Sequence, residues 1–160
     1  MQFANIWLAG LLAVSASLPA RADTKIKVTL WDKPAIMSAG MQMNMGMGMH
    51  GDMSMAGMGI DVDTKNVPAG KVTFDVLNTS KDTIHEMIVS PIRDLDVTLP
   101  YVASESRVDE DASGDLGEVS ELDPGGAGSL TIDLKPGYYV LFCNVPGHFT
   151  SGMWTTIDVH

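Results

Sequence analysis

The chain has a single cysteine, Cys143, among its 160 residues. One cysteine cannot form a disulfide bond within the chain, so its thiol is left for another purpose, of which metal binding is one. Basic residues are also few, with ten lysines and arginines against 20 aspartates and glutamates. Nucleic-acid binding requires a basic surface, so this charge balance argues against that class of function. An acidic surface raises the local concentration of metal cations modestly, and it also serves solubility alone.

No apolar run long enough to span a membrane occurs after residue 22. The apolar stretch from Phe3 to Leu18 is followed by the small-residue site Ala20-Arg21-Ala22, although no Lys or Arg precedes it. This pattern predicts a secretory signal peptide at residues 1–22, because the stretch is short for a spanning helix. Residues 23–160 then form one exported domain without membrane insertion, and a bacterial periplasm is the expected location. That domain keeps nine basic and 20 acidic residues, a formal charge of −11.

The cysteine lies in a short segment with two further metal-binding side chains. The segment reads Cys143-Asn-Val-Pro-Gly-His148-Phe-Thr-Ser-Gly-Met153. A thiolate, an imidazole and a thioether on one tight loop are three of the four ligands of a blue-copper site, which needs one more histidine. Pro146 and Gly147 favour a bend, because proline fixes φ and glycine accepts φ values that other residues avoid. The alternative is a lone buried cysteine that packs as a small apolar residue.

His85 is the candidate for the second histidine. It begins the run His85-Glu86-Met87-Ile88-Val89, in which residues 85, 87 and 89 share one face of a strand. If Met87 and Val89 point into the core, His85 points inward too. A lone histidine on an apolar face is more often a satisfied core residue than a ligand, so the strand position alone does not assign this role.

At these residues the sequence resembles the cupredoxin family of type 1 copper proteins. The Cys-x4-His-x4-Met spacing is similar to that of the rusticyanin, auracyanin and sulfocyanin group, and His85 matches the first copper histidine. The resemblance implies copper as the cofactor, bound by His85, Cys143 and His148 with Met153 as a weak axial ligand. Many cupredoxins place asparagine after the first histidine, where it braces the cysteine loop, whereas this chain has Glu86.

Methionine is concentrated in one glycine-rich stretch, residues 37–59, which holds nine of the twelve methionines together with a histidine. So many glycines predict a flexible segment outside the packed core. Such methionines could form an adaptable apolar surface. We favour a soft-ligand tract for Cu(I), because thioethers select Cu(I) and exposed methionines are otherwise a liability to oxidation. The candidate ligands are Met41, Met43, Met45, Met47, Met49, His50, Met53, Met55 and Met58.

The rest of the chain alternates short apolar patterns with Pro/Gly turns, and no convincing long helix is found. Strands are expected at residues 24–32, 71–76, 84–89, 116–122, 130–134, 138–143 and 153–159. The polar segment 91–114 is expected to hold a short helix at 100–108 and a solvated charge run at 109–111. These signals predict an all-β fold, a Greek-key β-sandwich, and the resemblance makes it cupredoxin-like.

Three functions compete for a cupredoxin of this kind. An enzyme has the least support, because multicopper enzymes add His-x-His pairs and the four histidines here form none. An electron carrier needs one copper ion and has no use for nine methionines on a flexible loop. The Met/His-rich tract resembles that of CopI-type periplasmic copper-tolerance proteins, which implies copper binding and copper tolerance. The expected partners are copper ions and a periplasmic redox or copper-transfer protein; the alternative function is periplasmic electron transfer.

Overall fold

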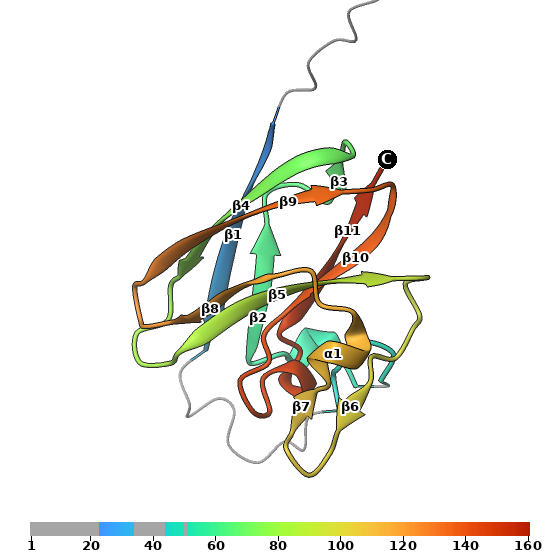
Figure 1. Cartoon of the computed structure of the whole chain (residues 1–160). Coiled ribbons are helices and arrows are strands. Elements are labelled where there is room, and N and C mark those ends of the chain that lie inside the picture. The colour runs from blue at the N-terminus through green and yellow to red at the C-terminus, as the bar shows by residue number, and fades with distance from the viewer. Residues whose placement is uncertain (1–22, 34–43, 50) are drawn as a thin grey trace, which may run out of the picture.

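The computed structural model describes residues 23–33, 44–49 and 51–160. The strands are β1 (Thr24–Asp32), β2 (Met58–Val62), β3 (Asn66–Val67), β4 (Gly70–Asn78), β5 (His85–Ile92), β6 (Tyr101–Val102), β7 (Arg107–Val108), β8 (Glu118–Leu122), β9 (Ala127–Leu134), β10 (Gly137–Phe142) and β11 (Trp154–Val159). One sheet has the strand order β2-β1-β4-β9 and the other β3-β11-β10-β5-β8, while β6 and β7 form a separate hairpin. The two larger sheets pack against each other, so the predicted all-β sandwich is confirmed (Figure 1).

Period-two alternation in the sequence places the apolar residues of the first sheet on one face. In β1 and β4 the alternate residues are buried while their neighbours face outward. The two strands pair in parallel, with Ile26 opposite Phe74 and Val28 opposite Val76. All four side chains belong to the main core between the sheets. Burial of an apolar side chain of this size stabilises the fold by about 1.5–3 kcal/mol. A shift of the pairing by one residue would move these side chains to the solvent face, so their burial fixes the register.

The second sheet is buried on both faces where β5 and β10 run side by side. Met87 and Leu141 point into the main core, whereas their neighbours Ile88 and Phe142 point to the opposite face. That opposite face carries a second core, which also holds a methionine from the predicted copper-binding tract. The members of the second core are Met47, Ile88, Ile92, Leu99, Val108, Val140, Phe142 and Phe149.

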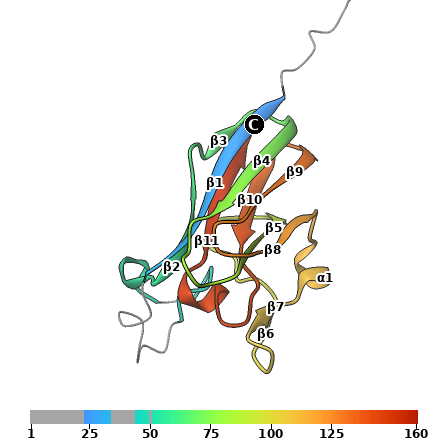
Figure 2. The ribbon, with the colours of Figure 1, turned by 90° about the vertical axis from the view of Figure 1, so that its left-hand side faces the viewer.

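One end of the sandwich gathers most of the irregular segments. The loop between β10 and β11 contains the 3-10 helix η3 (Phe149–Ser151), drawn in red. The same end holds the β6–β7 hairpin, the single-turn helix α1 (Glu110–Ser113) and the segments 44–49 and 51–57, drawn in cyan (Figures 1 and 2). Segments that are far apart in the sequence therefore meet around the loop that contains Cys143.

The short helix expected at residues 100–108 is wrong. This stretch forms the β6–β7 hairpin, in which Tyr101 pairs with Val108. The aromatic and β-branched residues at these positions prefer extended structure, and Val108 is buried in the second core. The helix comes later and has a specific start, because the Asp109 side chain accepts a hydrogen bond from the Ala112 amide at 3.0 Å. The charge run 109–111 thus spans the start of a helix, and Asp109 and Asp111 are exposed there, as expected of a solvated charge run.

The expectation that the methionine tract stays outside the core is wrong for two of its members. Met45 and Met47 are buried, and Met47 belongs to the second core. A 3-10 turn, η2 (Met53–Met55), follows, and Met58 begins β2. Glycine enrichment predicted a loop, but here it allows the backbone to approach other side chains closely. The tract residues Met41, Met43 and His50 lie outside the described part of the chain.

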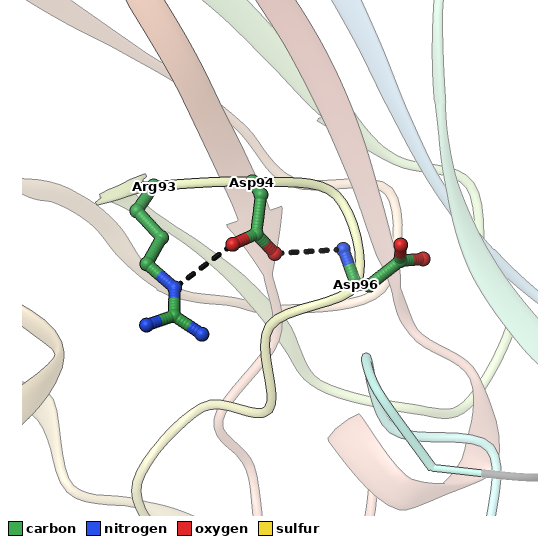
Figure 3. Close-up of polar contacts among 3 residues, drawn as sticks. All are labelled: Arg93, Asp94 and Asp96. Carbon is green, nitrogen blue, oxygen red and sulfur yellow. Dashed lines mark hydrogen bonds and ion pairs between the residues drawn. The ribbon is translucent and has the colours of Figure 1, made fainter.

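The turn after β5 is held by local polar contacts around Asp94 (Figure 3). The Nε of Arg93 donates to one carboxylate oxygen of Asp94 at 2.8 Å, and the Asp96 amide donates to the other at 3.1 Å. Within residues 23–33, 44–49 and 51–160 this is the only ion pair found. Both side chains are largely exposed, so the pair contributes about 1 kcal/mol or less and serves to shape the turn.

Candidate metal centre

Cys143 lies at the end of β10, where that strand gives way to a tight loop. Its amide donates to the Met153 carbonyl at 3.1 Å, and the Met153 amide donates to the His148 carbonyl at 3.1 Å. Gly147 and Gly152 have φ values of 84° and 92°, which favour glycine at both bends. These bonds bring the three predicted ligands of the loop back to one end of the β10–β11 hairpin.

His85 begins β5 on the neighbouring strand. The turn before it is ordered by Asn78, whose side-chain amide donates to the Thr83 and Leu122 carbonyls, both at 2.9 Å. A register shift in the β5–β8 pairing falls between His85 and Met87. Both of these residues are fully buried, so the prediction that His85 points inward is confirmed.

Three donor atoms converge between the two strands. The Nδ1 atoms of His85 and His148 are 3.2 Å apart, and the Cys143 Sγ is 3.4 Å from the His148 Nδ1. All three ligand atoms lie within 4.8 Å of one another. One thiol and two imidazoles are arranged as in a type 1 copper site, and copper is the cofactor that this donor set fits.

Met153 is placed at the same end of the main core as these donors. Its side chain is fully buried and belongs to the same apolar cluster as Cys143. Its backbone hydrogen bonds to Cys143 and His148 connect it directly to both predicted ligands of the loop. A buried thioether at this position has the chemistry of a weak axial copper ligand.

Burial keeps the donors in their neutral forms while no metal is bound. It raises the pKa of the Cys143 thiol to about 12, although the amides of Glu86 and Val145 partly oppose this. Burial and then the charge of His85 lower the pKa of His148 to about 4. Burial also lowers the pKa of His85, with Asp32 acting in the opposite direction. The site at pH 7 is therefore one thiol and two neutral imidazoles, of which only the thiol must lose a proton to bind a metal.

Binding of Cu(II) should consequently release protons in a pH-dependent way. At pH 8, where the Cys143 thiol is protonated and Glu86 is mostly ionised, we expect about one proton per copper ion. Below pH 4, where His148 is protonated as well, the release should exceed one proton per copper ion and the affinity should fall more steeply. Calorimetry in buffers of different ionisation enthalpy measures this number. A release of zero at pH 8 would contradict thiolate ligation.

Glu86 supports the start of the copper loop through contacts with Cys143 and Asn144. Its carboxylate accepts a hydrogen bond from the Asn144 amide at 2.9 Å, and its own amide faces the Cys143 Sγ at 3.5 Å. Burial raises the pKa of Glu86 to about 7, the Asn144 amide opposes this, and nearby carboxylates including Glu118 and Glu110 add to it. Glutamate thus supplies the brace that the resemblance assigns to asparagine, with an added charge beside the site.

Asn144 extends this brace to the β6–β7 hairpin. Its side chain accepts from the Val108 amide at 2.7 Å and donates to the Val108 carbonyl at 2.9 Å. It also donates to the Glu110 carboxylate at 2.7 Å. Neither Asn144 nor Glu110 was singled out from the sequence. The position of Asn144 directly after the cysteine was the one available signal, and its partners are more than 30 residues away.

The charge of Glu86 should lower the reduction potential of a bound copper ion. Glu86→Gln keeps an oxygen acceptor for the Asn144 amide but removes the charge, so at pH 8 the potential should rise by tens of millivolts or more. Glu118→Gln is the matched control, because Glu118 is exposed and its charge is screened. Potentiometric titration of both variants decides this, and equal potentials for wild type and Glu86→Gln at pH 8 would contradict it.

The described members of the methionine tract differ in their exposure to solvent. Met53 and Met55 are exposed, at 41% and 49%, and Met49 and Met58 are partly buried. Met53 and Met58 line one open depression of about 290 Å³, together with Trp31 and both neighbours of Met153. The described part of the tract therefore has buried members, Met45 and Met47, and accessible ones.

Comparisons with known proteins agree with the fold. Residues 119–160 match the sulfocyanin (SoxE) domain model. The chain is similar to the structure of dithionite-reduced auracyanin from Roseiflexus castenholzii, with 21% identity, a TM-score of 0.53 and coverage of 88% of this chain and 99% of that one. It is similar to rusticyanin from Thiobacillus ferrooxidans, with 18% identity, a TM-score of 0.56 and coverage of 88% and 79%. It is also similar to auracyanin B, with 16% identity, a TM-score of 0.54 and coverage of 91% of this chain and 95% of that one.

No curated protein sequence matches the chain. Among the described residues, no helix combines the length and the apolar character needed to cross a membrane.

Proposed function

We propose that the chain is a cupredoxin with copper as its cofactor, that it binds copper in the periplasm, and that it acts in copper tolerance. The observation that carries the proposal is the convergence of His85, Cys143 and His148 on one point. We assign these three residues as the equatorial ligands of a type 1 centre. Met153 is assigned as the weak axial ligand.

Each ligand has a distinct part in such a centre. Bound copper supplies one-electron redox chemistry. Cys143 would give up its proton and contribute the thiolate, while His85 and His148 would hold the copper ion as neutral imidazoles. Burial of Cys143 and His85 excludes water from most of the site. Part of the His148 residue remains exposed, which leaves one edge of the centre open to solvent.

The accessible methionines support copper tolerance over simple electron transfer. Thioethers prefer Cu(I), and Met53 and Met58 line the same open depression beside the copper loop. Their position would let Cu(I) bind at the surface without disturbing the buried donors. In this proposal Met41, Met43 and His50 are further ligands for Cu(I).

Electron transfer is the second candidate. The partly exposed His148 supports it, because an electron donor or acceptor could approach the centre at that edge. The proteins to which the chain is similar in fold include rusticyanin, which one of the solved structures names as a copper protein. A periplasmic redox or copper-transfer protein is the partner expected under either function.

We propose a non-enzymatic role and export by the signal peptide predicted at residues 1–22. Within the described residues, one cluster of three or more histidine, cysteine or acidic side chains could hold a metal, and it is the His85–Cys143–His148 cluster. A single centre of this kind fits copper binding and electron exchange better than multicopper catalysis.

Cu(I) stoichiometry tests the tolerance proposal. A variant with serine at Met41, Met43, Met53 and Met55 should lose Cu(I) equivalents, measured by competition with a chromogenic Cu(I) chelator, but keep the visible band of the Cu(II) protein. Leu95→Ser is the matched control, because Leu95 is an apolar residue of comparable exposure, at 51%. It should change neither quantity.

Growth of the corresponding strains in copper gives the cellular result. The strain with four serines should tolerate less copper than the wild type, and a Cys143→Ser strain should show how much protection needs the type 1 centre. Full Cu(I) binding by the four-serine variant, with normal growth of both strains in copper, would contradict copper tolerance. Electron transfer would then be the function supported.

A further inference from the structure

The buried part of the methionine tract lies against the copper loop. We call residues 44–49 the methionine clasp. Both views show this segment, in cyan, close to the red loop that follows β10 (Figures 1 and 2). The Met45 amide donates to the Thr150 carbonyl at 2.9 Å, and the Trp154 Nε1 donates to the Met45 carbonyl at 2.6 Å. Met45 is thus hydrogen-bonded to Thr150, which precedes Met153 in the sequence, and to Trp154, which follows it.

Side-chain packing reinforces these two bonds. Met47 is fully buried in the second core together with Phe149, the residue that follows His148. Gly46 lies so close to the Phe149 ring that a Cβ at this position would be 2.6 Å from it. A Cβ added to Gly152 would lie 3.6 Å from the Cβ of Met45. The clasp therefore covers the loop from Phe149 to Gly152, which connects the two proposed ligands His148 and Met153.

The clasp is itself a closed turn. The Met49 amide donates to the Gly46 carbonyl and the Gly51 amide to the Asn44 carbonyl, both at 2.8 Å. Gly48 has a φ of 73° and lies against the Thr98 backbone, where a Cβ would be 2.9 Å from the amide nitrogen. These contacts fix the turn at its ends and at its tip, so it can act as a support for the loop.

We propose that the methionine clasp is a positioning element of the type 1 centre, and that Met45 and Met47 are supports rather than Cu(I) ligands. By holding residues 149–152, it fixes the separation of His148 and Met153 and with it the strength of the axial contact. The axial ligand tunes the redox potential of such centres. The tract thus has two functions, with buried methionines that position the loop and accessible ones, Met53 and Met55, that meet the metal. This rests on the ligand assignment proposed above.

Removing the Met47 side chain tests the clasp. Met47→Ala should alter the visible band and the reduction potential of the Cu(II) protein, and should speed copper loss at least about tenfold. Met47→Leu, which refills most of the space, should restore all three. Leu134→Ala is the matched control, because it opens a similar cavity in the main core at the far end of β9. It should lower stability without changing the band or the potential.

Hydrogen exchange of the metal-free protein separates the clasp from the ligand assignment. In Met47→Ala the Met45 amide and the Trp154 indole N–H should exchange at least about tenfold faster than in wild type, and in Leu134→Ala their change should be no larger than that of amides elsewhere. Equal bands, potentials and exchange rates for Met47→Ala and wild type would overturn the proposal. Faster exchange in a protein whose wild type shows no type 1 band would instead refute the ligand assignment alone.

Discussion

Cys143→Ser is expected to abolish the intense visible band of the Cu(II) protein. That band arises from charge transfer between a thiolate and copper, and Cys143 is the only cysteine in the chain. The Cys143 side chain is fully buried, and its Sγ is 3.4 Å from the His148 Nδ1. Because the chain has no second cysteine, no other thiolate can take its place. A serine hydroxyl is a harder ligand that keeps its proton at neutral pH, so Cu(II) affinity should fall as well.

The fold should survive this substitution. A buried hydroxyl in place of the thiol costs about 1–3 kcal/mol if it lacks a partner, which a sandwich of this size tolerates. Circular dichroism and thermal unfolding of the metal-free variant check that it is folded, and the visible spectrum after addition of Cu(II) gives the result. A folded Cys143→Ser protein that kept the band would contradict the assignment of the thiolate.

Deletion of residues 37–59 is expected to destabilise the protein by several kcal/mol. The composition of this segment favoured a loop that could be removed at little cost, but the deletion would strip Met45 and Met47 from buried positions. Truncating one fully buried methionine side chain costs about 2–5 kcal/mol. The deletion would also remove the first residues of β2, the edge strand that pairs Met58 with Asp32.

Urea unfolding of the metal-free proteins measures this loss. A variant with serine at Met53 and Met55 is the control, because both methionines are exposed and lie outside the second core. Its unfolding midpoint should stay near that of wild type. A deletion protein with the wild-type midpoint would show that the packing of the clasp contributes little.

The parts of the fold that depend on local pattern could be predicted from the sequence. Alternation of Ile26, Val28 and Leu30 with polar residues predicts a strand wherever one face is buried, and the structure places all three in the core. The spacing of Cys143, His148 and Met153 lies within one hairpin loop, so its geometry is also local. The inward direction of His85 followed from the period of its strand.

The parts that depend on distant partners could not be predicted. The burial of Met47 requires Phe149, which is about a hundred residues later, and a glycine-rich sequence carries no sign of that contact. The brace at Glu86 likewise requires the Asn144 amide on another strand. A short helix is predicted at residues 100–108, and the hairpin found there could not be foreseen, because the packing of Val108 in the second core depends on side chains elsewhere in the fold.

The most direct test of the central claim is the spectrum of the protein expressed without residues 1–22 and loaded with Cu(II). Optical absorption and electron paramagnetic resonance, recorded on the same sample with its copper content, show the ligand set of the metal. Convergence of His85, Cys143 and His148 predicts one type 1 copper ion per chain, with an intense thiolate-to-copper band and a narrow copper hyperfine splitting. A colourless Cu(II) protein with the wide splitting of a nitrogen and oxygen site would contradict it.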